Sequence, residues 1–169
     1  MDIGVIRLLF EYNEWADRRI MAASLEVSQE EYAAAPRSGI GRESIRASLH
    51  HILNSERGWR LICQGEPRVD WDAISEEACP TAQGLAAQWQ TEENAMRAYL
   101  GSLTDADLET TVRYMDDDIP RERTLWHCLV HLVNHGTQHR SEAAVLLTRA
   151  GRSPGDVDFT LFLNEHFPA

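Results

Sequence analysis

Apolar residues recur at three- and four-residue steps along most of the chain, which is the period that buries one face of an α-helix. The first such stripe predicts a helix that begins near Val5 and continues past Ile20. Its apolar positions are Val5, Leu8, Leu9, Tyr12, Trp15, Ala16, Ile20 and Ala23. Further along, Ser28 and Glu31 have the spacing of a capping box, which predicts a short helical turn.

The same periodicity predicts three more long helices. The second begins near Ser44 and ends before Gly65 and Pro67, because a glycine followed by a proline terminates a helix. The third and fourth predicted helices span Thr81–Leu103 and Thr124–Ala150. We also expect a short final helix within Asp156–Phe167.

The connecting segments complete the predicted architecture. Residues 66–80 indicate a loop, and residues 104–123 contain the pattern TTVRYM-DDD-IPRERT, which suggests a small hairpin around a solvated acidic turn. Four amphipathic helices that cover one another's apolar faces form a four-helix bundle, so the fold class is all-α. Both long connections leave a simple up-down and a crossed arrangement open. We find no repeat or linker and expect residues 1–169 to form one domain.

The charge and composition exclude several classes of function. Lys and Arg total 16 against 27 Asp and Glu, which gives a net charge of −11. An acidic surface repels phosphate backbones, so we expect no nucleic-acid partner. The chain has no lysine, which excludes lysine Schiff-base chemistry and a phosphate loop ending in Gly-Lys-Ser/Thr.

The cysteines and the hydropathy indicate the compartment. The three cysteines, Cys63, Cys79 and Cys128, are an odd number without a C-x-x-C pair, which favours a reducing, cytoplasmic setting over a disulfide framework. Cys128 is expected to be a buried, inert thiol. No apolar run approaches the roughly 18 residues that cross a bilayer, and the N-terminus lacks a signal-peptide pattern, so we expect no membrane association.

Histidines occupy four successive positions on the fourth predicted helix: His127, His131, His135 and His139. Each four-residue step rotates by about 40°, so neighbouring histidines share a face of the helix. Two imidazoles at this spacing can chelate one divalent ion. The spacing occurs three times in this helix and does not select the pair by itself. The alternative is that these are structural histidines that donate to carbonyl groups.

The second predicted helix carries two adjacent histidines, His50 and His51. Adjacent helical residues point about 100° apart, so only one of the two can face the bundle axis. The buried side is marked by Leu49, Ile52 and Leu53. We therefore expect His51 to point inward and His50 to lie on the helix surface.

Three segments resemble the DinB-like (YfiT/DinB) family of metalloenzymes: YNEWADRRI (12–20), LHHILNSERGW (49–59) and HLVNHGTQHR (131–140). The resemblance covers essentially the whole chain. It implies a four-helix bundle with a crossed connection, a homodimer, and a divalent metal, commonly zinc or nickel, held by three histidines. In this sequence the implied metal ligands are His51, His135 and His139, with His131 as a neighbour of the site.

One departure from the family pattern concerns Glu142. The family often continues its last histidine as His-Arg-Gly-Gln, whereas this chain has His139-Arg140-Ser141-Glu142. Glu142 is either a partner of the site or an exposed salt-bridge residue, and we favour the exposed position. Asn134 is a weaker candidate for a supporting role. Tyr12 and Trp15 could line the pocket, although plain core positions are favoured for both.

Three neutral imidazoles leave at least one coordination position open, as in catalytic rather than structural metal sites. Relatives in the family include thiol-dependent transferases and isomerases. Our leading hypothesis is therefore a metal-dependent enzyme, a thiol-dependent transferase or a hydrolase, acting on a small molecule with a low-molecular-weight thiol as a candidate partner. The alternative is a non-enzymatic, stress-related bundle that binds a metal or a ligand. The metalloprotease motif H-E-x-x-H is absent.

Overall fold

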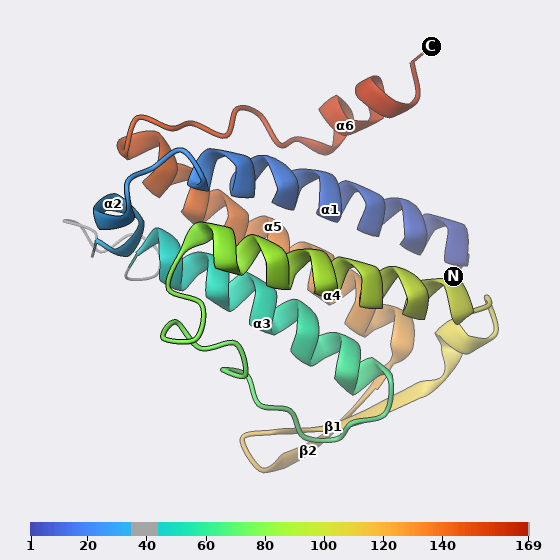
Figure 1. Cartoon of the computed structure of the whole chain (residues 1–169). Helices are drawn as coiled ribbons and strands as arrows, with labels where there is room; N and C mark the ends of the chain where they lie inside the picture. Colours follow the sequence, from blue (N-terminus) through green and yellow to red (C-terminus); the bar gives the residue numbers. More distant parts are fainter. Residues whose placement is uncertain (35–43, 169) are drawn as a thin grey trace.

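The computed structural model describes residues 1–34 and 44–168, and four long helices dominate it (Figure 1). They are α1 (Ile3–Ser24), α3 (Ile45–Cys63), α4 (Ala82–Ser102) and α5 (Leu125–Arg149). The shorter elements are α2 (Gln29–Ala33), the 3₁₀ helix η1 (Asp107–Glu109), strands β1 (Thr111–Asp116) and β2 (Ile119–Thr124), and α6 (Phe159–His166). The predicted all-α, four-helix bundle is confirmed.

The predicted starts of α2, α3 and α4 coincide with side-chain caps, which satisfy backbone N–H groups that the first turn leaves unpaired. Ser44 accepts a hydrogen bond from the backbone N–H of Ala47, and Thr81 accepts one from Gly84. Both halves of the capping box between Ser28 and Glu31 are present. The boundaries predicted from the sequence therefore rest on local chemistry that the fold retains.

The four long helices run in two parallel pairs, α3 with α4 and α1 with α5, and the two pairs are antiparallel to each other. The Tyr99 hydroxyl donates to the carbonyl of Cys63 over 2.9 Å, which brings together the carboxyl ends of α4 and α3. Near the start of α1, the Arg7 guanidinium donates to the carbonyl of Leu100 over 3.0 Å, so α1 and α4 are antiparallel. Around the bundle the order is α1, α5, α3, α4, so α1 lies diagonally opposite α3 and α4 lies diagonally opposite α5. Of the two arrangements left open by the sequence, the crossed one is observed.

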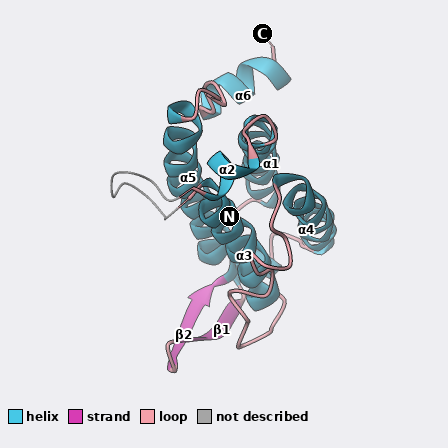
Figure 2. Ribbon diagram, turned by 60° about the vertical axis from the view of Figure 1, so that its left-hand side comes forward, coloured by secondary structure: helices cyan, strands magenta, loops and turns pink. Residues whose placement is uncertain are grey.

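The predicted hairpin is present and joins the connection between α3 and α4. Strands β1 and β2 pair antiparallel with Tyr114 opposite Arg121. Asp117 and Asp118 form the turn with positive φ angles of 46° and 66°, which aspartate tolerates better than most residues. The backbone N–H of Met115 donates to the carbonyl of Pro67 over 2.9 Å. The hairpin and α6 lie on opposite sides of the bundle (Figure 2).

The apolar core is divided into two clusters along the bundle. One cluster includes Phe10, Leu129 and Leu132, and the other includes Ile20, Leu53 and Leu147. Buried polar residues lie on the same helices between these two clusters: Asn13, Asp17, Glu56, Glu92, Glu93 and Arg140. Within residues 1–34 and 44–168, none of the helices combines the length and apolar character that crossing a membrane requires.

Candidate metal centre

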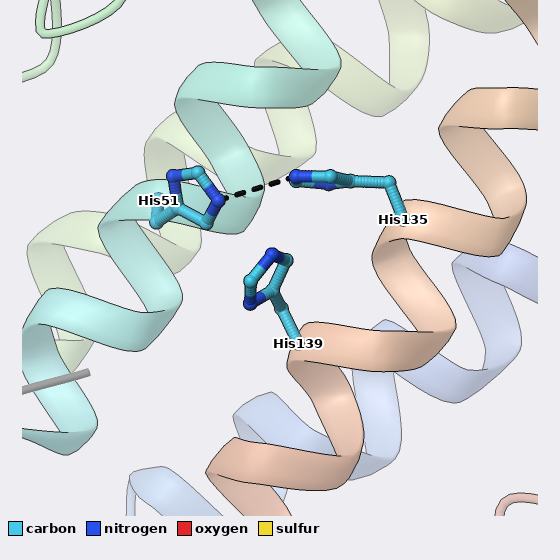
Figure 3. Close-up of side chains that lie close together, drawn as sticks. All are labelled: His51, His135 and His139. Atoms are coloured by element: carbon cyan, nitrogen blue, oxygen red, sulfur yellow. Dashed lines mark hydrogen bonds between the residues drawn. The ribbon is translucent and has the colours of Figure 1, made fainter. Parts of the chain in front are cut away.

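Helices α3 and α5 bring together His51, His135 and His139, the three histidines implied as ligands. One ring nitrogen from each lies within 4.8 Å of the others, and all three side chains are half-buried. Figure 3 shows the three rings pointing toward one another between the two helices. His51 comes from α3, whereas His135 and His139 occupy successive turns of α5. The four-residue spacing on α5 brings His135 and His139 together, and the antiparallel packing of α3 against α5 adds His51.

The distances among these rings fit one small cation. The Nε2 atoms of His51 and His135 lie 3.2 Å apart. Two zinc–nitrogen bonds of about 2.0–2.1 Å at a tetrahedral angle separate their nitrogens by about 3.3–3.4 Å. The ring centroid of His139 lies 4.4 Å from that of each of the other two. The donor set is therefore suited to a divalent ion that accepts imidazole ligands.

Glu142 orients His139, which corrects the exposed position favoured from the sequence. A carboxylate oxygen of Glu142 lies 2.9 Å from Nδ1 of His139, one helical turn away, and the Glu142 side chain is only 26% exposed. A carboxylate that accepts the Nδ1–H of a histidine fixes the tautomer whose Nε2 lone pair can bind a metal. The interaction arises because residues three apart on a helix lie on the same face.

A family model described as the DinB family matches residues 3–166 of this chain. The chain belongs to the DinB family. Among curated proteins, Protein DinB of Bacillus subtilis (strain 168) is 26% identical over 161 residues, covering 92% of this chain and 91% of that relative. The family resemblance of the three sequence segments is thereby confirmed.

Two solved structures share the fold of this DinB-family chain. YfiT from Bacillus subtilis, described as a probable metal-dependent hydrolase with an unusual four-helix bundle topology, superposes with a TM-score of 0.67 and 19% identity. That match covers 88% of this chain and 89% of YfiT. A DinB-like protein from Bacillus cereus ATCC 10987 gives a TM-score of 0.69 at 18% identity, covering 89% of this chain and 95% of that one. At these identities the comparison establishes the bundle topology alone.

His50 is buried, and its predicted surface position is wrong. Its side chain is 4% exposed, with Nδ1 3.0 Å from the carbonyl of Ile74 and Nε2 2.9 Å from the carbonyl of Cys79. The cause is the parallel packing of α3 and α4, because the chain from 64 to 81 must return along α3 and covers its outer face. Asn54 fixes the same segment by exchanging two hydrogen bonds with the backbone of Ile74, each 3.0 Å long.

The other predicted candidates lie outside the group of three histidines. His131 lies one turn before His135, and its ring centroid is 4.9 Å from that of Trp59. Partial burial lowers the pKa of the His131 imidazole. Tyr12 and Trp15 pack in the core and donate to residues near the end of the chain, Val157 and Glu165.

Three further candidates from the sequence lie in positions that do not indicate a role at the metal centre. Cys128 is 2% exposed, as expected for a buried thiol. His127 and Asn134 are exposed on α5. None of the three belongs to the group of residues that could hold a metal ion within the described chain.

A buried charge network joins α1, α3 and α5, and the sequence analysis did not predict it. Arg140 is 1% exposed and donates to Asn13 over 2.6 Å and to Asp17 over 3.0 Å. The amide of Asn13 donates in turn to Asp17 over 2.8 Å and to Glu56 over 2.6 Å. Gly136 leaves the space that this network fills, since a Cβ atom there would lie 2.7 Å from Arg140.

The network contains two carboxyl groups and one guanidinium group. Burial, followed by the negative charge of Asp17, raises the pKa of Glu56 well above its usual value. Burial also raises the pKa of Asp17, and Arg140 opposes that rise. Asn13 bridges the two carboxyl groups, because its amide donates to both. Of the two, Glu56 has the pKa raised further above its usual range, and a proton on Glu56 would leave the network electrically neutral.

A signal for this network was present in the sequence. Asn13 falls three and seven residues before the buried Ala16 and Ile20, so it shares their helical stripe. A polar residue inside an apolar stripe needs a buried partner. The identity of that partner could not be read, because Arg140 is 127 residues away in the sequence.

Proposed function

We propose that this protein is a metal-dependent enzyme whose histidines His51, His135 and His139 hold one divalent ion, zinc or nickel. The observation that carries the proposal is the convergence of three ring nitrogens within 4.8 Å, on two helices, with one ring oriented by a carboxylate. The description of YfiT as a probable metal-dependent hydrolase supports the same class of function.

The residues of the chain have distinct roles in this proposal. His51, His135 and His139 would hold the divalent ion, which would act as a Lewis acid and lower the pKa of a bound water or thiol. His135 and His139 fix one side of the centre because their helix positions are four residues apart. His51 closes it from the opposite helix. Glu142 keeps the Nδ1 proton on His139 and so directs Nε2 toward the other two rings.

We further propose that the reaction is a hydrolysis or a transfer that uses a low-molecular-weight thiol, with a small molecule as substrate. The two reactions differ in what occupies the open position. A thiol cosubstrate added to the cobalt-loaded protein gives a sulfur-to-cobalt charge-transfer absorption when it binds the metal, whereas a hydrolase that excludes thiols gives none. The homodimer and the cytoplasmic location stay predictions.

The first test is metal analysis of protein purified without a histidine tag. We expect about one equivalent of a divalent metal in the wild type, and loss of that metal in His51→Ala and His135→Ala. His127→Ala is the matched control because His127 lies on the same helix but outside the group of three. Equal metal content in all four proteins, or none in the wild type after incubation with zinc and nickel, contradicts the proposal. Metal binding without turnover of any thiol or ester substrate favours the non-enzymatic alternative.

A further inference from the structure

Four aromatic rings gather at the end of the α3–α5 seam that lies toward the hairpin. We call Trp59, Trp71, Tyr114 and His131 the aromatic cluster. Trp59 is its centre, with ring centroids 4.9 Å from His131, 5.1 Å from Tyr114 and 6.1 Å from Trp71. The rings come from α3, from the α3–α4 connection, from β1 and from α5. Segments that are far apart in the sequence thus place four flat side chains together.

The aromatic cluster is continuous with the three histidines. The ring centroid of His131 lies 5.7 Å from that of His135, so the two groups share a boundary. On the opposite helix, Trp59 follows His51 by eight residues, which is about 12 Å along the helix axis. A molecule bound at the histidines can therefore reach the aromatic rings if it extends for about 6–12 Å along the seam.

Two members of the aromatic cluster are exposed, His131 and Trp71, and the Trp71 segment is held in place by backbone hydrogen bonds. Trp71 is 41% exposed, yet its ring lies directly on Gly58, where a Cβ atom would be 2.5 Å from Trp71 Cζ3. Its segment is fixed on one side by Pro67, which accepts a hydrogen bond from β1, and on the other by Ile74, which bonds to Asn54. The Trp71 ring therefore packs on the aromatic cluster with one side and meets solvent with the other, the setting in which tryptophan is enriched at binding interfaces.

We propose that the aromatic cluster is the part of the substrate site that binds a flat, uncharged aromatic or unsaturated group of a small molecule whose donor atom reaches the three histidines. The inference rests on the proposed function, because it assumes a metal at those histidines. An uncharged group is favoured since two Arg–carboxylate pairs on the neighbouring hairpin already satisfy each other's charge. Arg113 binds Glu122 over 2.6 Å, and Arg121 binds Asp116 over 3.2 Å.

The test uses two ligands that share one metal-binding head. Imidazole and 4-phenylimidazole are titrated into the cobalt-loaded protein, and the visible absorption of the cobalt ion reports binding. If the phenyl ring is buried against the aromatic cluster, 4-phenylimidazole binds about tenfold more tightly than imidazole. Trp71→Ala reduces that preference to about threefold or less and leaves the affinity for imidazole unchanged.

Gly58→Ala is the second variant, because it displaces the Trp71 ring without removing it. Alanine also favours the helix, so the variant folds, and it is expected to lose the phenyl preference as Trp71→Ala does. Leu25→Ala is the control, because Leu25 has the same 41% exposure as Trp71 and lies at the end of α1. Its preference should equal that of the wild type.

The outcomes separate this inference from the proposed function. Equal affinity for the two ligands in the wild type, or a phenyl preference that survives in both variants, overturns the role of the aromatic cluster while the metal site stands. A wild-type protein that takes up no cobalt, zinc or nickel fails at the earlier step of metal analysis and overturns both proposals.

Discussion

Replacing Arg140 with methionine removes the guanidinium group of the hydrogen-bonded network that joins Asn13, Asp17 and Glu56. Methionine has a similar length and no charge, so the main loss is electrostatic. The substitution removes the hydrogen bonds of Arg140 to Asn13 and Asp17 and leaves the Asp17 carboxylate 2% exposed and facing Glu56. An uncompensated charge in the centre of the bundle is the expected result.

Breaking a buried ion pair from one side typically costs about 3–5 kcal/mol. We adopt this range because Arg140 is 1% exposed, so the lost interaction is little screened by solvent. For a chain of this size, each kcal/mol shifts Tm by about 2–4 °C, and the expected fall is about 6–20 °C. Removing the stranded charge as well, in Arg140→Met/Asp17→Asn, should recover part of the loss.

The dependence on pH identifies the mechanism. Burial already raises the pKa of Asp17, and loss of Arg140 raises it further because this cation opposes the rise. A carboxyl group whose folded pKa exceeds its unfolded value contributes full stability below the unfolded pKa, and this stability is lost as the pH increases through the folded pKa. The cost of Arg140→Met should therefore be larger at pH 8 than at pH 5.

Urea unfolding followed by circular dichroism at both pH values measures these differences. Glu56→Gln is the matched control, since glutamine is neutral and can still accept from Asn13, and its cost at pH 7 should be under about 1 kcal/mol. A cost below about 1 kcal/mol for Arg140→Met, or a cost that does not change between pH 5 and pH 8, would refute the argument that Arg140 neutralises a buried carboxylate.

Three further predictions concern the centre and its surroundings. Because Glu142 orients His139, Glu142→Gln should weaken zinc binding about tenfold, and Glu142→Ala should weaken it by up to about 100-fold, as measured by competition with a chelator. The control Glu122→Gln, on the hairpin, should leave zinc affinity unchanged. Removing the metal with EDTA should lower Tm by about 5–10 °C, and added zinc should restore it. This magnitude assumes a metal concentration of about 100 times the Kd. An unchanged Tm argues against a metal at the histidines. Gly136→Ala should destabilise the fold by about 1–3 kcal/mol in calorimetry, because the added Cβ would lie 2.7 Å from Arg140. Alanine has the higher helix propensity, so a variant more stable than the wild type would contradict the described packing.

The local parts of the fold were predictable because their signals are short in range. The stripe from Val5, the serine at Ser44 and the paired breakers Gly65 and Pro67 each act within one or two helical turns. The hairpin was indicated by the run of aspartates, which occupies its turn. Helix geometry already placed His51 inward. The family resemblance added the crossed arrangement and selected His135 and His139 among the four histidines of α5, which their spacing alone could not do.

The errors concern residues whose surroundings come from distant parts of the chain. His50 was expected at the surface because its own helix shows no apolar neighbour on that side, but the chain from 64 to 81 covers it. Glu142 was expected in solvent because charged residues on a helix usually are, yet the same helix offered His139 as a partner three residues away. The partners of Asn13 depend on which helices are neighbours, and no local pattern encodes that.

The parallel packing of α3 and α4 also affects where the length of this chain can vary. Helix α3 is about 28 Å long, whereas the segment 64–81 could reach about 60 Å if fully extended. The segment is therefore much longer than it needs to be to span the length of α3. Its second half is fixed by His50 and Asn54, while residues 64–68 are exposed. Insertions and deletions among relatives are expected to concentrate in residues 64–66, ahead of the hydrogen bond between Pro67 and β1, and an additional loop grafted there should leave the bundle intact.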